Sequence, residues 1–214
     1  MTFPMKVRHG IFLALGLLCG CTALVTEYRR SRNEPKLPLP ERDRQTRIST
    51  RIMGQGRLTL TTMERALGQN NPQLSQEKIQ EIARAYLEES RAEGVNHDLA
   101  FAQMSLETGY LRFRGQVRAS QNNFCGLGAT DDGAHGVSFR SVREGIRAHI
   151  QHLKAYGSRE ALKNPCVDPR FHFVSRGSAR TLYDLAGRWA SDRHYGEKLR
   201  ERLILFYRLQ NSES

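Results

Sequence analysis

The sequence predicts a mostly α-helical domain of the α+β class, with only a small β excursion. Two observations support this class. Apolar residues recur at intervals of three and four over several long segments, which is the period of an amphipathic helix. Alternating, strand-like segments are sparse, and residues 137–139 are the main candidate strand. We therefore expect helices to build the core and the β excursion to stay local.

The first 21 residues predict export and lipid attachment rather than a membrane span. Lys6 and Arg8 precede an apolar run over residues 11–18, which is well short of the ~20 apolar residues that a transmembrane helix needs. The sequence Leu-Cys-Gly-Cys that ends at Cys21 resembles a bacterial lipobox, which implies lipidation of the Cys21 sulfur. We expect a lipoprotein of the cell envelope, anchored at its periplasmic or outer-membrane face. A plain signal peptide and an uncleaved anchor are the alternatives.

Residues 22–51 predict a basic tether. They contain three prolines and many arginines, a composition that favours an extended, semi-stiff spacer with little to bury. The whole chain carries a net charge of +11, which suits polyanionic partners such as acidic wall polymers or anionic headgroups. Export counts against nucleic acid as the partner. A simple solvated linker is an equally good interpretation of the tether.

The domain is expected over residues 52–210, beginning with two helices. Apolar spacing predicts a short helix over residues 58–67, which ends at the loop 68–72. Ser75 is a suitable N-cap for a long amphipathic helix that ends at Gly94.

The segment 96–110 predicts a central helix that is buried on nearly every side. Asn96 or Asp98 is suited to cap its start, and Gly109 to end it. Gln103 and Glu107 interrupt the apolar run at positions i and i+4, so they project from one face. A carboxylate in such a helix requires a partner. Glu107 either pairs with an arginine or lines a cleft, where desolvation would raise its pKa and make it a general acid.

The second half of the chain predicts an irregular region followed by three helices. Residues 121–128 are rich in Asn and Gly and predict a tight, shaped turn or a short strand, and an irregular stretch leads to the candidate strand. Ser141 and Glu144 form a capping-box pattern at the start of a helix. A second helix is expected from Ser178 to Trp189, and a third over residues 196–209.

Four motifs in this order resemble the bacterial endo-β-N-acetylglucosaminidase family of peptidoglycan hydrolases. They are the segment 102–110 (AQMSLETGY), the turn 122–127 (NNFCGL), the segment 139–141 (FRS) and the segment 189–199 (WASDRHYGEKL). The resemblance implies a lysozyme-like helical domain with the β excursion beside a groove. It also implies cleavage of the bond after N-acetylglucosamine in peptidoglycan glycan strands.

The resemblance also implies roles for individual residues. Glu107 matches the catalytic general acid, and Tyr195 matches an aromatic hydroxyl that faces the cleaved sugar. The second catalytic group has two candidates, because only Asp131 and its neighbour Asp132 follow the turn. Either Asp131 (or Asp132) positions water or the substrate acetamido group attacks. The remaining residues expected at the substrate are Gln103, Tyr110, Asn123, Phe124 and Trp189. Capping of the turn is an equally good role for Asn123.

No cofactor and no metal are expected. His135, His149 and His152 lack a Cys or carboxylate that would complete a ligand spacing. Cys125 and Cys166 would either pair or remain thiols. The expected partners are glycan strands and, through the anchor, a membrane, with the protein as a monomer. Two other functions remain open: a catalytically weak or inactive wall-binding lipoprotein, and a lipid-tethered scaffold of the envelope.

Overall fold

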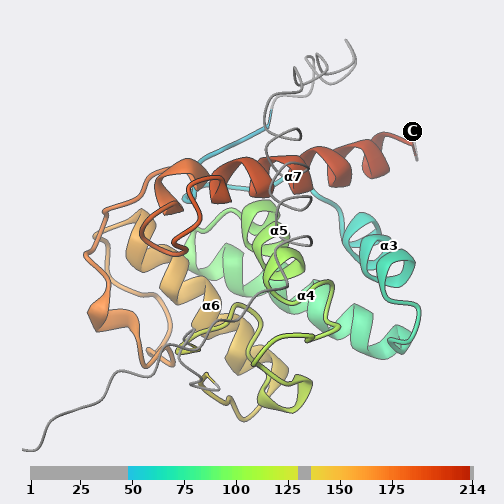
Figure 1. Ribbon diagram of the computed structural model, residues 1–214, viewed down its shortest axis with the longest axis horizontal. Coiled ribbons are helices and arrows are strands. Elements are labelled where there is room, and N and C mark those ends of the chain that lie inside the picture. Colours follow the sequence, from blue (N-terminus) through green and yellow to red (C-terminus); the bar gives the residue numbers. More distant parts are fainter. Residues whose placement is uncertain (1–47, 130–135, 213–214) are drawn as a thin grey trace, which may run out of the picture. The chain divides into compact units, whose positions relative to one another are not determined.

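The computed structural model describes residues 48–129 and 136–212, and this part of the chain is mostly helical (Figure 1). Its α-helices are α3 (Leu60–Asn70), α4 (Gln76–Glu93), α5 (His97–Glu107), α6 (Val142–Gly157) and α7 (Tyr195–Asn211). Three short 3-10 helices join them: η1 (Ala119–Gln121), η2 (Phe171–Phe173) and η3 (Leu182–Leu185). The predicted fold class is confirmed. Within these residues, β pairing is limited to isolated bridges, such as the one between Met53 and Val95.

Helix α5 lies at the centre of the domain. It contacts α4, α6 and α7, and in Figure 1 it lies below α7 and in front of α4. Phe101 and Met104 are fully buried, as expected for a helix that is apolar on nearly every side. Its position places the end of α5, and therefore Glu107, beside the start of α7.

The capping residues of α4 and α5 act largely as the sequence predicts. The Ser75 side chain accepts the amide hydrogen of Lys78, and Gly94 ends α4 in the left-handed conformation at φ 73°. Of the two candidate caps of α5, Asn96 is the one used. Asp98 instead accepts hydrogen bonds from the backbone of Arg57 and from the Tyr207 hydroxyl. It therefore ties the segment before α3, and α7, to the start of α5.

Helix α6 begins at the predicted cap. The Ser141 hydroxyl accepts the amide hydrogen of Glu144, but the Glu144 carboxylate bonds to the amide of Arg140 rather than to that of Ser141. Gly145 lets the helix approach the preceding turn closely, because a Cβ there would overlap the carbonyl oxygen of Asn122. This contact fixes the turn 122–127 against α6.

Two predicted elements are wrong. No long helix runs from Ser178 to Trp189, and the Ser178 hydroxyl makes no hydrogen bond and caps nothing. Asp184 accepts from the amide and hydroxyl of Thr181, which starts only the short helix η3, and the chain then turns at Gly187 with φ 74°. Residues 137–139 form no strand: the amides of Val137 and Phe139 donate singly to the carbonyls of Leu127 and Gln121, each at 2.8 Å.

The described chain contacts the domain from its first residues. Ile48 packs against the core, and the carbonyl of Thr50 accepts the amide hydrogen of Leu182 at 2.8 Å. None of the helices in the described part is both long and apolar enough to span a bilayer. The expected signal segment with Cys21, the tether as far as residue 47, and the candidate Asp131 lie outside the described residues.

A buried ion pair joins α4 to α6. The Lys154 ammonium lies 2.9 Å from the Glu93 carboxylate, and both side chains are fully buried. Glu93 also accepts the backbone amides of Lys163 and Asn164. Burial alone would raise the pKa of Glu93, but these hydrogen bonds outweigh it and hold the pKa below its ordinary value.

Replacing Lys154 with Met should therefore destabilise the domain strongly. The substitution leaves a buried carboxylate without its cation, which costs about 3–5 kcal/mol of the free energy of unfolding. Urea unfolding measures this, with Lys78→Met as the control, because the pair of Lys78 with Glu81 is exposed and is worth less than about 1 kcal/mol. Equal losses in the two variants would show that the buried pair contributes no more than a surface pair.

Candidate active site

Glu107 is the last residue of α5, and its carboxyl group is held by residues from a distant part of the chain. The Tyr195 hydroxyl, at the start of α7, donates a hydrogen bond to Oε1 of Glu107. Glu107 remains open to solvent on one side. No Lys or Arg is paired with it among the described residues. The structure therefore supports the cleft interpretation of Glu107 rather than the salt bridge.

The surroundings of Glu107 favour its protonated form. Burial raises the pKa of its carboxyl, while hydrogen bonds from Tyr195 and Trp189 lower it, and the net shift is upward. The negative end of the α5 dipole also disfavours a carboxylate at this position. Burial and the nearby Glu107 raise the pKa of Tyr195 well above its ordinary value, so that its hydroxyl remains a donor.

A cavity of about 290 Å³ opens beside Glu107. Phe113, Val117, Asn123 and Gly126 are among the residues that line it with Glu107. These walls combine an apolar surface with backbone groups of the turn 122–127. The cavity can therefore receive a polar ring with the Glu107 carboxyl at its edge.

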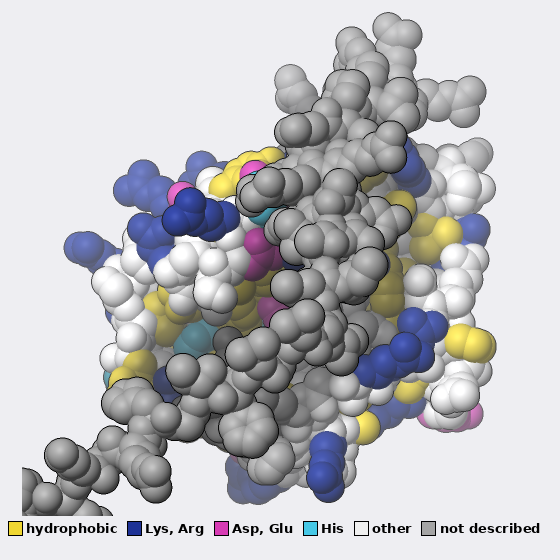
Figure 2. Space-filling model, in the orientation of Figure 1, with side chains coloured by type: hydrophobic (Ala, Val, Ile, Leu, Met, Phe, Trp, Pro, Cys, Tyr) yellow, Lys and Arg dark blue, Asp and Glu magenta, His cyan; other side chains and the backbone are white. Residues whose placement is uncertain are grey.

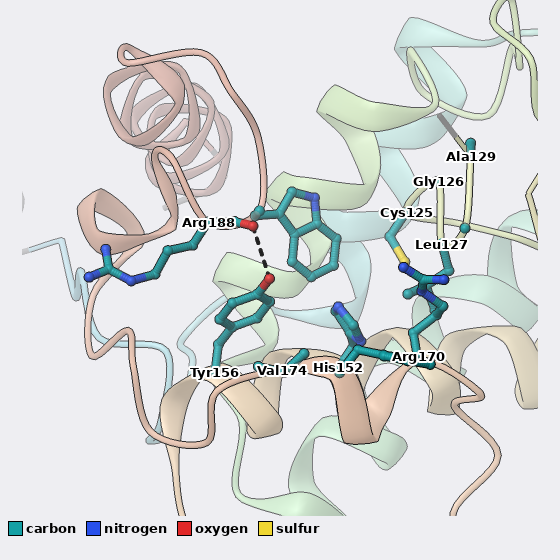
Figure 3. A pocket seen from close by; sticks show the side chains of 12 residues that line it. Cys125, Gly126, Leu127, Ala129, His152, Tyr156, Arg170, Val174 and Arg188 are labelled. Atoms are coloured by element: carbon teal, nitrogen blue, oxygen red, sulfur yellow. Dashed lines mark hydrogen bonds between the residues drawn. The ribbon is translucent and has the colours of Figure 1, made fainter. Parts of the chain in front are cut away.

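A second cavity, of about 250 Å³, adjoins the first and is drawn in Figure 3. Gly126 and Ala129 line both cavities. In the second, His152 and Tyr156 rise from α6 on the side opposite the turn, and Trp189 and Arg170 also line it. The two cavities form a groove that crosses the turn.

His152 is held in this second cavity by a buried carboxylate. Its Nδ1 lies 2.7 Å from Asp168, and its ring meets the Trp189 ring edge-on at 5.1 Å. The Tyr156 hydroxyl donates to the carbonyl of Arg188 at 3.0 Å, which is the dashed line in Figure 3. Trp189 lines this cavity and also packs against the core.

Asn123 and Phe124 shape the groove from behind. The Asn123 amide is buried, donates to the carbonyls of Leu127 and Val137 at 2.9 and 3.0 Å, and accepts the amide hydrogen of Leu127. Phe124 is buried against Phe113 with ring centroids 6.2 Å apart. Of the two roles open for Asn123, the geometry favours capping of the turn.

Two residues expected at the substrate lie elsewhere. Gln103 is fully buried, and its Nε2 donates to the Tyr195 hydroxyl at 2.8 Å. It shares a face with Glu107, but the start of α7 covers it. Tyr110 is also buried, lines neither cavity, and accepts a hydrogen bond from Arg202 at 2.6 Å. Both residues therefore support the domain instead of contacting sugar.

The sequence points to His149 and His152 only as candidate metal ligands. In the structure His149 bonds to Gln103 at 3.0 Å behind the groove, and His152 bonds to Asp168 within the second cavity. Within the described ranges, no group of three or more His, Cys, Asp or Glu side chains could hold a metal ion.

Cys125 is buried, Cys166 is exposed, and the two are free thiols.

A helical domain that presents a carboxyl group with a raised pKa in a groove has the features of a site for acid catalysis. Residues 83–207 match the family model Glucosaminidase, described as mannosyl-glycoprotein endo-beta-N-acetylglucosaminidase. The chain belongs to this glucosaminidase family, and membership implies a glycoside hydrolase. It is also 45% identical over 161 residues to an uncharacterized protein of Borreliella burgdorferi, covering 75% of this chain and 79% of that one. No solved structure matches.

Proposed function

We propose that this protein is a peptidoglycan hydrolase that cleaves the β-1,4 bond after N-acetylglucosamine in glycan strands. The observation that carries the proposal is the Glu107 carboxyl group. It has a raised pKa, has no cationic partner among the described residues, and faces a groove. Family membership supports the same chemistry.

In the proposed reaction Glu107 donates its proton to the glycosidic oxygen as the bond breaks. The Tyr195 hydroxyl donates to Oε1, which leaves Oε2 to carry the proton that is transferred. After transfer, the hydrogen bonds from Tyr195 and Trp189 stabilise the carboxylate that forms. Sugar units on either side of the bond would occupy the two cavities.

We propose two candidates for the second catalytic group. Glu107 is the only carboxylate among the described residues that line the two cavities. Either Asp131 activates a water molecule or the acetamido group of the substrate attacks the anomeric carbon. The acetamido route needs no further carboxylate from the protein.

The proposed location is the cell envelope, with the chain anchored through lipid on Cys21 and its domain acting on glycan strands. The supporting observations are the lipobox-like sequence and the basic charge. On the face shown in Figure 2, Lys and Arg side chains (dark blue) stand at several separate places around the domain. Such a surface suits an acidic polymer.

The principal alternative is a wall-binding protein without activity. Incubation of purified sacculi with the full chain separates the two, because a hydrolase releases soluble glycan fragments while a binder only sediments with the sacculi. Release of fragments supports the proposal. Sedimentation without release under every condition would favour the binding protein.

The activity should fall as the pH rises through the pKa of Glu107. A general acid works only when protonated, and burial raises the Glu107 pKa above that of an ordinary carboxyl group. We expect the basic limb of the profile of kcat/KM against pH to lie above the pH at which a solvated Glu titrates. A flat profile across this range would contradict a Glu107 general acid.

A further inference from the structure

A chain of buried hydrogen bonds leads from α4 through α6 to Glu107. The Tyr86 hydroxyl lies 2.9 Å from Nδ1 of His149, and Nε2 of His149 lies 3.0 Å from Oε1 of Gln103. Nε2 of Gln103 donates to the Tyr195 hydroxyl at 2.8 Å, and that hydroxyl donates to Glu107. Tyr86, Gln103 and His149 are fully buried.

The proton positions along this chain follow from the bonding capacity of each group. The Gln103 carbonyl oxygen can only accept, so Nε2 of His149 must donate to it. Burial lowers the pKa of His149 to about 3, so the ring is neutral and its Nδ1 must accept. Tyr86 therefore donates to Nδ1; burial raises its pKa, which keeps its hydroxyl protonated.

The opposite orientation would leave one buried hydroxyl hydrogen without an acceptor. If the Gln103 amide were turned over, its NH₂ group would face Nε2 of His149, and Nδ1 would have to carry the ring hydrogen. The Tyr86 hydroxyl would then accept from Nδ1, and its own hydrogen would have no acceptor among the hydrogen bonds of the described residues. The Tyr195 hydroxyl would donate to Gln103 rather than to Glu107. A buried polar group without a partner is costly, so the observed orientation is the stable one.

We propose that Tyr86 and His149 are positioning residues that fix the Gln103 amide and thereby commit the Tyr195 hydroxyl to donating to Glu107. Neither Tyr86 nor His149 lines the two cavities that form the groove, so both act through Gln103 and Tyr195. The role rests on the proposed function in that it matters for catalysis only if Glu107 is the acid. The arrangement of the hydrogen bonds does not depend on that function.

Few other ionisable groups lie beside this series of hydrogen bonds. Glu107 is faced by Tyr195 and by Cys125, and burial raises the pKa of each so that both stay neutral. His149 is faced by Tyr86 and by His152, whose charge would further lower the pKa of His149. Loss of the donor from Tyr195 should therefore change the titration of Glu107 in one direction, upward, because that bond lowers its pKa.

The test is the double variant Tyr86→Phe with His149→Phe. It removes both partners of the first hydrogen bond and keeps the aromatic rings that pack on Phe101 and Trp189. The Gln103 carbonyl oxygen then has no donor on α6, so the amide can turn over. The Tyr195 hydroxyl is then no longer committed to donating to Glu107. We expect kcat to fall about tenfold, part of the ~10²-fold or more that a general acid contributes.

Two readouts distinguish positioning from folding. Carbon NMR of the Glu107 carboxyl should show titration at higher pH in the double variant, and the basic limb of the activity profile should move the same way. His149→Gln retains a donor for Gln103 and should titrate close to the wild type. Tyr207→Phe, which removes another buried hydroxyl bonded elsewhere, should leave the titration unchanged.

An unchanged Glu107 titration in the folded double variant would overturn the proposal. A shift of equal size in Tyr207→Phe would also overturn it, because any buried hydroxyl would then serve. If the wild type releases nothing from sacculi, the proposed function fails. The NMR titration still decides whether the series of hydrogen bonds from Tyr86 controls the pKa of Glu107.

Discussion

Glu107→Gln is expected to reduce hydrolysis of peptidoglycan by about 10²–10⁴-fold, the contribution typical of a general acid. Gln has nearly the same size and can still accept the hydrogen bond from Tyr195, but it has no proton to give. Binding to glycan strands should persist, because the walls of the two cavities are unchanged. Release of fragments and co-sedimentation with sacculi measure the two effects separately.

The stability of the same variant tests the local electrostatics. Because the folded protein raises the pKa of Glu107, its protonated form favours folding at low pH, and this contribution is lost as the pH rises through the folded pKa. The melting temperature of Glu107→Gln should therefore increase relative to that of the wild type as the pH rises. Glu201→Gln, at an exposed position on α7, is the control. A large fall in melting temperature together with loss of binding would return Glu107 to a structural role.

Tyr195→Phe is expected to have the second largest effect, a loss of about 10²-fold in kcat. The ring is buried and stays in place, while Glu107 loses its donor and Gln103 loses its acceptor. Since the lost bond lowers the pKa of Glu107, the basic limb of the activity profile should also move to higher pH. Steady-state kinetics over a pH series measure both changes.

Tyr183→Phe provides the matched control, because Tyr183 lies on η3 close to the start of α7 and is 42% exposed. Its hydroxyl group should contribute nothing to turnover. Wild-type activity in Tyr195→Phe, or an equal loss in Tyr183→Phe, would remove the catalytic role of the Tyr195 hydroxyl.

The sequence predicted those parts of the fold that depend on local chemistry. Ser75 and Gly94 bound α4 because a side-chain cap and a left-handed glycine act within one turn. The predicted helix from Ser178 failed because Thr181 and Asp184 close a tighter turn first. Whether the helix or the turn forms depends on side-chain hydrogen bonds, which the spacing of apolar residues does not predict.

The candidate site divides in the same way. Glu107 could be singled out because a carboxylate beyond the first turn of an apolar helix is visible in the sequence. The inward position of Gln103 could not, since the start of α7 covers it and leaves Glu107 open. His149 and Tyr86 lie 46 and 17 residues from Gln103 along the chain, so only the packing of α4 and α6 on α5 brings the three together.

The most direct test of the proposed function is the identity of the reducing ends that the full chain forms on purified sacculi. Reduction of the released fragments with borohydride, followed by mass spectrometry, distinguishes a reduced N-acetylglucosamine end from a reduced N-acetylmuramic acid end. We expect new ends at N-acetylglucosamine, formed by the wild type and not by Glu107→Gln. Ends at N-acetylmuramic acid, or equal product from the two proteins, would contradict the proposed cleavage or its proton donor.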